Sequence, residues 1–255
     1  MIRAVIFDYG NTLVGIDPSM ESRRADYADV VARPGAERLA RRLVGFGALE
    51  ESASAGFVAR FLDVRETNRA RADATGDEIT AATSLAETLR AVGAPALPQE
   101  RIAEALLDFF STEEERIVAI PGAGESLAWL RARGVPTALL SNATDGAYVS
   151  RVAARFGWRE WLDPFLVSAD LGVRKPRREA FEAVLRAWPF RAGEVAMVGD
   201  SLRHDVQGAD ALGLATVHFT WIEHPADAAA GTSVRPRYRV STHEALRAAL
   251  LPALD

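Results

Sequence analysis

The chain of 255 residues has the composition of a globular protein, with 49% apolar and 25% charged residues. Its net charge of -5 lacks the basic signature of proteins that bind nucleic acid or anionic membranes, so we expect neither partner. The absence of cysteine excludes a disulfide framework, a thiolate metal site and a cysteine nucleophile. No apolar stretch reaches the roughly 18 residues of a membrane span, and Asp8 interrupts the first apolar run, which argues against a secretory leader; we therefore expect a cytoplasmic protein.

The first pattern along the chain is a short apolar run over residues 4–7 that ends at Asp8 and leads into a Gly-Asn turn signal. An unbroken apolar run of this length is typical of a strand buried on both faces of a parallel sheet. Asp8 would then lie at the carboxyl end of a central strand, where open α/β sheets bind their ligands. A carboxylate there can act as a nucleophile, a metal ligand or both, although an Asp can also simply cap the following turn.

The next hundred or so residues have the apolar spacing of helices, and no convincing strand pattern interrupts them. The expected helices cover residues 36–44, 51–71, 78–92 and 98–110. This pattern predicts an all-helical insertion over residues 17–112. Arg65, Asn68 and Arg69 are its candidate substrate-reading side chains, although a charged helix face is usually only solvated.

From about residue 115 onward, strand and helix patterns alternate, which predicts a doubly wound parallel sheet. The strands are expected at 136–141, 165–168, 194–199, 215–219 and 238–240, and the helices at 124–133, 146–156, 178–188, 205–212 and 242–251. The strand before Asp8 completes this sheet, so the α/β core is expected to comprise residues 1–16 and 113–255. A mobile loop is expected from Pro225 to Gly231.

Two further strand ends carry side chains that can bind an anion. Ser141 and Asn142 end one strand, where a hydroxyl and the turn amides can hold a phosphate oxygen, or the serine can cap the next helix. Lys175 follows another strand and is the single lysine among 30 lysine and arginine residues. Pro176 excludes Lys175 from helical geometry and so predicts its position at a loop-helix junction. A compact ammonium suits a tight anionic site better than a guanidinium does, although a solvated lysine is the plain alternative.

A second carboxylate motif repeats the arrangement at Asp8. Asp200 ends the apolar run 196–199, and Asp205 follows five residues later at the expected start of a helix. Hard oxygen ligands of this kind suit magnesium, which binds to few carboxylates and retains several waters. For Asp205 a simple helix-start role is the strong alternative, because Asp is favoured there.

In this order, the four motifs resemble those of the haloacid dehalogenase-like (HAD) hydrolase superfamily, whose core is a Rossmann-like parallel sheet. The matching residues are Asp8-Tyr9-Gly10-Asn11-Thr12, Ser141, Lys175-Pro176 and Gly199-Asp200 with Asp205. The helical block corresponds to the first-type cap of that family in position and all-α character. Each motif alone is weak evidence, but four in order at strand ends are specific.

The resemblance implies a phosphatase that uses Mg²⁺ and acts on a small phosphorylated molecule through an aspartyl-phosphate. Asp8 would be the nucleophile and Lys175 its partner, while Thr12 and Ser141 would hold phosphate oxygens. Asn142 would assist through its amide, and Asn11 is expected beside the substrate. The implied metal site comprises Asp8, the carbonyl of Gly10, Asp200 and, as a ligand or in support of one, Asp205.

One departure from the family pattern concerns the proton donor. Phosphatases of the family usually carry an aspartate two places after the nucleophile, and here that place holds Gly10. A metal-independent dehalogenase would tolerate this glycine, but members of that branch lack a pair such as Gly199-Asp200. A non-catalytic binding or regulatory protein that kept the fold is the third interpretation. The sequence identifies neither the substrate nor the oligomeric state.

Overall fold

The structure, a computed structural model, describes residues 1–16, 27–222 and 234–254. The chain divides into two compact units, which are Met1–Gly15 with Val118–Asp255 and, between them, Ile16–Ile117. We call the first the core unit and the second the helical unit. The loop expected at 225–231 and most of the segment expected to lead into the helical insertion lie outside the described residues.

The core unit is built on a six-stranded sheet in the order β5-β4-β1-β6-β7-β8, and every neighbouring pair of strands is parallel. This arrangement confirms the predicted α/β fold class, with the strand before Asp8 near the centre. The strands are β1 (Ala4–Phe7), β4 (Thr137–Ser141), β5 (Leu162–Val167), β6 (Val195–Gly199), β7 (Ala215–Phe219) and β8 (Tyr238–Val240).

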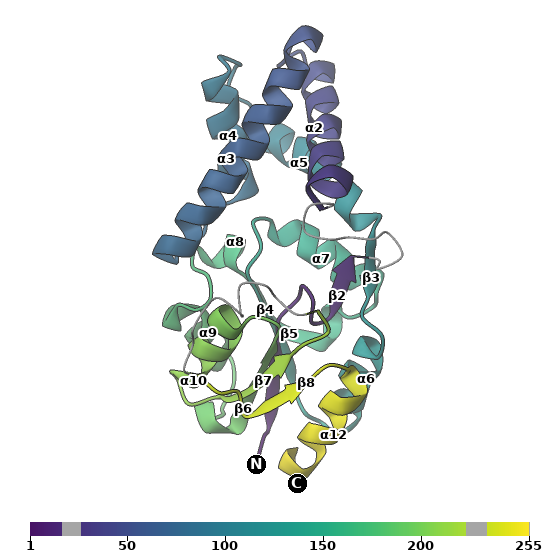
Figure 1. The fold of residues 1–255 in the computed structure, drawn as a ribbon, viewed down its shortest axis with the longest axis vertical. Helices are drawn as coiled ribbons and strands as arrows, with labels where there is room; N and C mark the ends of the chain where they lie inside the picture. The colour runs from purple at the N-terminus through teal and green to yellow at the C-terminus, as the bar shows by residue number, and fades with distance from the viewer. Residues whose placement is uncertain (17–26, 223–233, 255) are drawn as a thin grey trace. The chain divides into compact units, whose positions relative to one another are not determined.

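The central strands are apolar throughout because helices cover both faces of the sheet. Ala4, Ile6 and Met197 pack on one face with Phe181 of α9, and all four side chains are buried. Figure 1 shows α9 and α10 on one side of the sheet and α6 and α12 on the other. The helices of the unit are α6 (Ala123–Ala132), α7 (Gly146–Arg155), α8 (Ser168–Leu171), α9 (Arg178–Leu185), α10 (Gly208–Asp210) and α12 (His243–Leu254), with shorter turns η4 (Arg159–Trp161), η5 (Ala192–Glu194) and η6 (Leu202–Gln207).

The strand register fixes which residues meet at the edge of the sheet. Phe7 of β1 lies level with Leu139 of β4 and with Val198 of β6. Because parallel strands end at the same edge, Asp8 and the residues that follow β4 and β6 emerge together.

Two short strands were not predicted. β2 (Val14–Ile16) and β3 (Ile117–Ala119) form a separate two-stranded sheet where the chain leaves the core unit and returns to it. Each has only three residues, which is too few to show the alternation of apolar and polar side chains that is typical of a strand.

The helical unit consists of η2 (Ala28–Ala32), α2 (Arg33–Gly45), η3 (Glu51–Ala53), α3 (Ser54–Thr75), α4 (Ala81–Ala91) and α5 (Gln99–Glu114). Its centre contains aromatic side chains from two helices. The ring of Phe61 stacks on Phe57 with centroids 5.9 Å apart and meets Phe109 edge-on at 5.2 Å. These rings lie on one face of α3 and one face of α5, as the helical spacing predicts.

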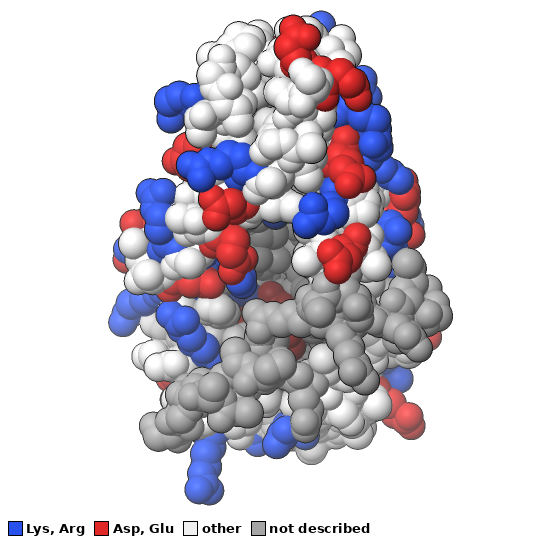
Figure 2. Space-filling view, turned by 45° about the horizontal axis from the view of Figure 1, so that its top comes forward, with Lys and Arg blue, Asp and Glu red and all other residues white. Residues whose placement is uncertain are grey.

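The surface carries charges of both signs. Figure 2 shows basic and acidic side chains interspersed over one face of the molecule. Within the described ranges, no helix is both long enough and apolar enough to cross a membrane.

Candidate active site

The side chain of Lys175 lies at the centre of a buried ionic cluster. Its Nζ donates to Oδ1 of Asp8 at 2.6 Å and to Oδ1 of Asp205, also at 2.6 Å. Only 1% of Lys175 is exposed, which is unusual for lysine and requires charged partners of this kind. The single lysine of the chain therefore bonds to the predicted nucleophile.

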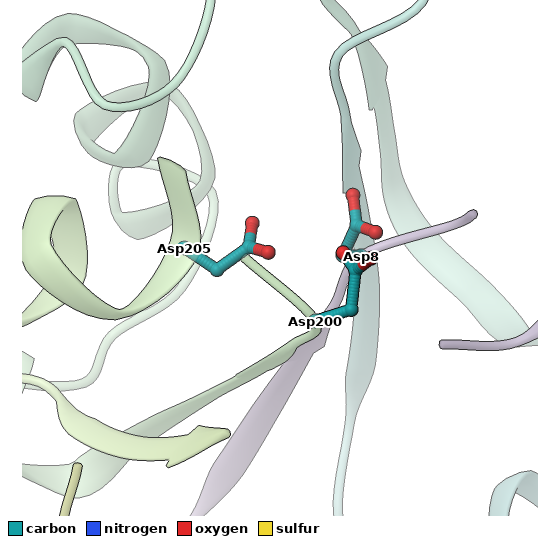
Figure 3. Close-up of side chains that lie close together, drawn as sticks. All are labelled: Asp8, Asp200 and Asp205. Atoms are coloured by element: carbon teal, nitrogen blue, oxygen red, sulfur yellow. The ribbon is translucent and has the colours of Figure 1, made fainter. Parts of the chain in front are cut away.

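The third carboxylate of the cluster belongs to Asp200. Ligand atoms of Asp8, Asp200 and Asp205 all lie within 4.8 Å of one another, and Figure 3 shows the three side chains gathered at the ends of β1 and β6. Oδ2 of Asp200 accepts a hydrogen bond of 3.0 Å from Nδ2 of Asn11. Asn11 has a φ of 54°, a left-handed conformation that asparagine adopts more readily than most residues. Its side chain thus supports Asp200, which the sequence pattern had not indicated.

Burial governs the protonation of the cluster. Desolvation raises the pKa of Asp8, an effect that the ammonium of Lys175 opposes and the carboxylate of Asp205 reinforces. Desolvation likewise raises the pKa of Asp200, and its two carboxylate neighbours add to the shift. For Lys175, burial alone would lower the pKa, but Asp205 and Asp8 outweigh burial and leave that pKa raised. The lysine is therefore a permanent cation at neutral pH.

The backbone at Lys175 is held by a side-chain amide. Oδ1 of Asn142 accepts from the Lys175 amide at 2.8 Å, and Nδ2 of Asn142 donates to the Lys175 carbonyl at 2.8 Å. This paired contact joins the end of β4 to the loop that carries Lys175. The side chain of Asn142 therefore orients Lys175. The backbone amide of Asn142 remains the predicted phosphate contact.

Asp205 uses both carboxylate oxygens within the protein. Oδ1 accepts from Lys175, and Oδ2 accepts from the Ser201 amide at 3.0 Å. The carboxyl group packs against Gly199, where a Cβ atom would collide with it, so glycine is required at that position. These contacts assign Asp205 to the support of Lys175 and of the loop after β6, and they leave Asp8 and Asp200 as the more available metal ligands.

Two predicted phosphate contacts, Thr12 and Ser141, are buried in the core unit. The hydroxyl of Thr12 has no hydrogen-bond partner among the described residues, although the side chain is 0% exposed. A buried hydroxyl without a partner is costly unless a ligand binds it. Thr12 therefore fits the role of holding an oxygen-rich ligand.

The charges of the cluster fit a divalent cation. Three buried carboxylates are bonded to or face one ammonium, so two negative charges remain uncompensated within the cluster when all three are ionised. The raised pKa values of Asp8 and Asp200 reflect this excess as well as burial. Carboxylate oxygens are the ligands that magnesium prefers, and a double positive charge would neutralise the site.

The three candidate residues in the helical unit are engaged within that unit. Asn68 is buried, and its Nδ2 donates to Ser84 at 3.1 Å and to Glu87 at 2.7 Å. The guanidinium of Arg65 stacks 4.3 Å from the ring centroid of Phe109, and Arg69 pairs with Glu66. Their role in reading a substrate remains a prediction.

Two buried histidines that the sequence analysis did not select bond to loops of the cluster. Nε2 of His218 on β7 lies 2.9 Å from the carbonyl oxygen of Asp200, and Nε2 of His243 lies 2.8 Å from that of Thr12. Neither histidine belongs to a short motif, because each acts on a loop distant in sequence. No local sequence pattern predicts such a contact.

Comparison with known proteins gives the same class as the geometry. The parallel sheet with a carboxylate cluster at its carboxyl edge defines an α/β protein that binds ligand at its strand ends. A family model described as haloacid dehalogenase-like hydrolase matches residues 2–213, and the chain belongs to this family. The resemblance inferred from the four motifs is thereby confirmed.

Curated relatives match over part of their length. Ribulose-1,5-bisphosphate 5-phosphatase of Halopiger xanaduensis is 35% identical over 111 residues, which cover 44% of this chain and 46% of that protein. Phosphoserine phosphatase of Thermus thermophilus is 33% identical over 146 residues, which cover 56% and 55% of the two chains. The chain thus spans about half the length of the curated relatives it matches.

Solved structures match over nearly the whole chain at lower identity. A HAD phosphatase from Thermococcus onnurineus has a TM-score of 0.61 at 19% identity and covers 98% of each chain. A 2-haloacid dehalogenase from Pseudomonas syringae has a TM-score of 0.65 at 20% identity and covers 99% of this chain and 100% of that one. The fold is therefore shared by phosphatases and dehalogenases, and it does not choose between them.

Proposed function

We propose that the protein is a magnesium-dependent phosphatase that hydrolyses a small phosphorylated metabolite through an aspartyl-phosphate on Asp8. The observation that carries this proposal is the buried cluster in which Lys175 bridges Asp8 and Asp205 with Asp200 beside them. Among the matched relatives, those from Halopiger and Thermus are named as phosphatases, which supports the same class of reaction.

Each residue of the cluster has a role in this reaction. An oxygen of Asp8 attacks phosphorus, and the bond from phosphorus to the leaving oxygen breaks as the new bond forms. Lys175 orients the Asp8 carboxylate and lies close enough to share in balancing the charge of the phosphoryl group. The hydroxyls of Thr12 and Ser141 hold phosphate oxygens. Water then hydrolyses the acyl phosphate and restores Asp8.

A bound Mg²⁺ would neutralise charge on the phosphoryl group and on the carboxylates. Asp8 and Asp200 would hold it through oxygen atoms, together with the carbonyl of Gly10. Asp205 would contribute through Lys175 and Ser201, because both of its oxygens already accept hydrogen bonds. Asn11 would keep Asp200 oriented.

Dehalogenation is the alternative that Gly10 favours. A carboxylate that attacks carbon needs no metal and no proton donor, and it would have no use for a third carboxylate at the position of Asp200. The proximity of Asp200 to Asp8 favours the phosphatase. A protein that kept the fold without turnover would bind a phosphorylated ligand and leave it intact.

One assay separates the three. Hydrolysis of p-nitrophenyl phosphate is measured with Mg²⁺ and with EDTA, beside release of halide from a 2-haloacid. We expect phosphate release that EDTA abolishes and no halide release. Mg²⁺ at a hundredfold excess over its Kd should also stabilise the fold by about 2.7 kcal/mol, and Asp200→Asn should remove this stabilisation. Phosphate release that is unaffected by EDTA would overturn the metal requirement, and no release from any phosphate ester would overturn the phosphatase.

A further inference from the structure

The side chain of His243 makes a long-range contact to the loop that follows the predicted nucleophile. His243 is the first residue of α12 and is 0% exposed. Its Nε2 lies 2.8 Å from the carbonyl oxygen of Thr12, which is 231 positions away in the sequence. Its Nδ1 lies 3.1 Å from the hydroxyl of Ser126 on α6. Both ring nitrogens are therefore engaged inside the core unit.

The direction of these hydrogen bonds follows from their partners. A carbonyl oxygen can only accept, so Nε2 carries the proton and donates to Thr12. In the neutral ring Nδ1 accepts from the Ser126 hydroxyl, which can donate instead to the carbonyl of His243 at 3.3 Å. Arg247 donates to the Ser126 oxygen at 3.0 Å, which directs the hydroxyl proton away from the guanidinium. The imidazole is thus an oriented donor to the Thr12 carbonyl, and its complete burial favours the neutral ring.

The surroundings allow His243 little movement. The ring of Phe219 on β7 lies with its centroid 4.7 Å from that of the imidazole. Gly122, at the start of α6, has a φ of 85° and lies where a Cβ atom would collide with the Cβ of His243. Arg247 also donates to the Gly122 carbonyl at 3.2 Å. The imidazole is therefore packed against β7 and the start of α6.

The residue that His243 holds has a buried hydroxyl without a hydrogen-bond partner among the described residues. Thr12 is fully buried, and its side chain has no hydrogen-bond partner among the described residues, while its carbonyl accepts from His243. The neighbouring loop is closed by bonds from the Leu13 amide to the Tyr9 carbonyl at 2.9 Å and from the Asn11 amide to the Val14 carbonyl at 2.7 Å. Those bonds shape the loop, but neither fixes the carbonyl of Thr12.

We propose that His243 is a positioning residue for phosphate binding, because it anchors the peptide of Thr12 and so aims the Thr12 hydroxyl at the ligand. The inference rests on the proposed function, since it needs a phosphoryl group to bind there. His218 supplies a parallel case at the neighbouring strand, where its Nε2 holds the Asp200 carbonyl at 2.9 Å. Two buried histidines thus each hold a backbone carbonyl of one loop of the site.

The experiment compares three variants of the full chain. His243→Leu keeps the bulk and removes the donor, whereas His243→Gln keeps an amide donor near the position of Nε2. Leu250→Ala is the control, because it removes a side chain of α12 that is 0% exposed and lies outside the site. Each variant is assayed with p-nitrophenyl phosphate and Mg²⁺, titrated with inorganic phosphate by calorimetry, and melted to record its Tm.

We expect His243→Leu to weaken phosphate binding about tenfold, as when one hydrogen bond to a charged ligand is lost. Its kcat/KM should fall by roughly 10²-fold, because the Thr12 hydroxyl is still present but displaced from its productive position. His243→Gln should recover most of both values. Leu250→Ala should keep them, even where its Tm falls as far as that of His243→Leu.

Two outcomes would overturn the inference, and they differ in whether the proposed function survives. An active wild type whose His243→Leu variant matches Leu250→Ala in phosphate affinity and kcat/KM would reduce His243 to a structural role and leave the proposed function standing. A wild type that neither hydrolyses phosphate esters nor binds phosphate would overturn the proposed function and this inference with it.

Discussion

The two units of the chain differ in their buried polar residues: among the described residues, the buried charged side chains lie in the core unit, whereas the buried polar side chains of the helical unit are uncharged. All four histidines and the single lysine belong to the core unit, and none occurs in residues 16–117. In the core unit, buried charges contact one another across distant segments, as Lys175 does with Asp8. In the helical unit, ion pairs such as Arg38 with Glu115 lie at the surface, with 34% and 54% of the side chains exposed. The comparison teaches that the core unit keeps charged side chains buried by pairing them with one another, whereas the ion pair of the helical unit remains in contact with solvent.

The largest expected effect is on turnover. Asp8→Asn removes the attacking oxygen anion but keeps the shape of the side chain, so the rate of phosphate release should fall by at least roughly 10³-fold. The fold should survive, because an amide is less costly to bury than a carboxylate. Single-turnover assays and a melting curve measure the two effects. A variant that retains a tenth of wild-type activity would show that another residue attacks phosphorus.

The second prediction sets one ion pair of each unit against the other. Lys175→Met should cost about 3–5 kcal/mol of unfolding free energy in metal-free buffer, because Asp8 and Asp205 lose their buried cation. Arg38→Met should cost no more than about 1 kcal/mol, because its pair with Glu115 is solvated. Urea titration measures both. Equal costs in the two variants would contradict the distinction between the units.

The third prediction concerns pH. Burial lowers the pKa of His243 to about 4, with Arg247 adding to the effect and the Thr12 carbonyl and Glu125 opposing it. Between the unfolded value near 6.5 and the folded value, the unfolded chain binds a proton at His243 and the folded chain does not. Stability should therefore fall as pH drops through this window, by about 3 kcal/mol at its lower end.

Urea titrations from pH 7 to pH 4 test this expectation against His243→Gln, which cannot titrate. The difference in stability between the two proteins should shift in favour of the variant as the pH falls. Carboxylates elsewhere contribute equally to both proteins and cancel in the difference. A constant difference across the range would place the pKa of His243 near its usual value and contradict its burial as a neutral donor.

Sequence patterns predicted the core unit well because local physical rules control its elements. The apolar runs before Asp8 and Asp200 fixed two neighbouring strands, and the strand predicted at 215–219 occurs with the same bounds. The position of Asp200 near Asp8 required only that neighbouring parallel strands end at one edge of the sheet. The family resemblance added the roles that those residues would have.

What the sequence did not indicate depends on contacts between distant segments. Nothing near His243 signals that its ring holds a carbonyl on the first loop, since the partner is 231 positions away. The side chain of Asn142 makes two hydrogen bonds to the backbone of Lys175. The position of Asn142 after a strand is equally compatible with phosphate binding, so the sequence does not indicate this contact. Strands β2 and β3 pair with each other although the helical unit separates them in the sequence. Tertiary contacts decide such features, and local propensity does not record them.

The smallest expected effect tests the missing proton donor at Gly10. Without a carboxylate there, the leaving oxygen must depart with little protonation, so the rate should fall steeply as the leaving group becomes more basic. Aryl phosphates, acyl phosphates and sugar 1-phosphates should react well, and simple primary-alkyl phosphates poorly. Gly10→Asp should flatten this dependence. The backbone accepts the change, because Gly10 is not among the positive-φ glycines and a Cβ there meets no described atom within 4 Å.

The measurement is a series of phosphate esters with leaving groups of graded pKa, assayed in both proteins under single-turnover conditions. The gain in Gly10→Asp should be confined to the poor leaving groups, because good ones need no proton. The rate gain should stay below roughly 10²-fold, which is the smallest contribution typical of a native general acid. The introduced carboxyl group has no surroundings that adjust its pKa for this role. Gly10→Ala controls for the added Cβ and should leave the slope unchanged. A flat dependence in the wild type, with phosphoryl transfer to Asp8 still limiting the rate, would mean that another group of this protein already donates the proton.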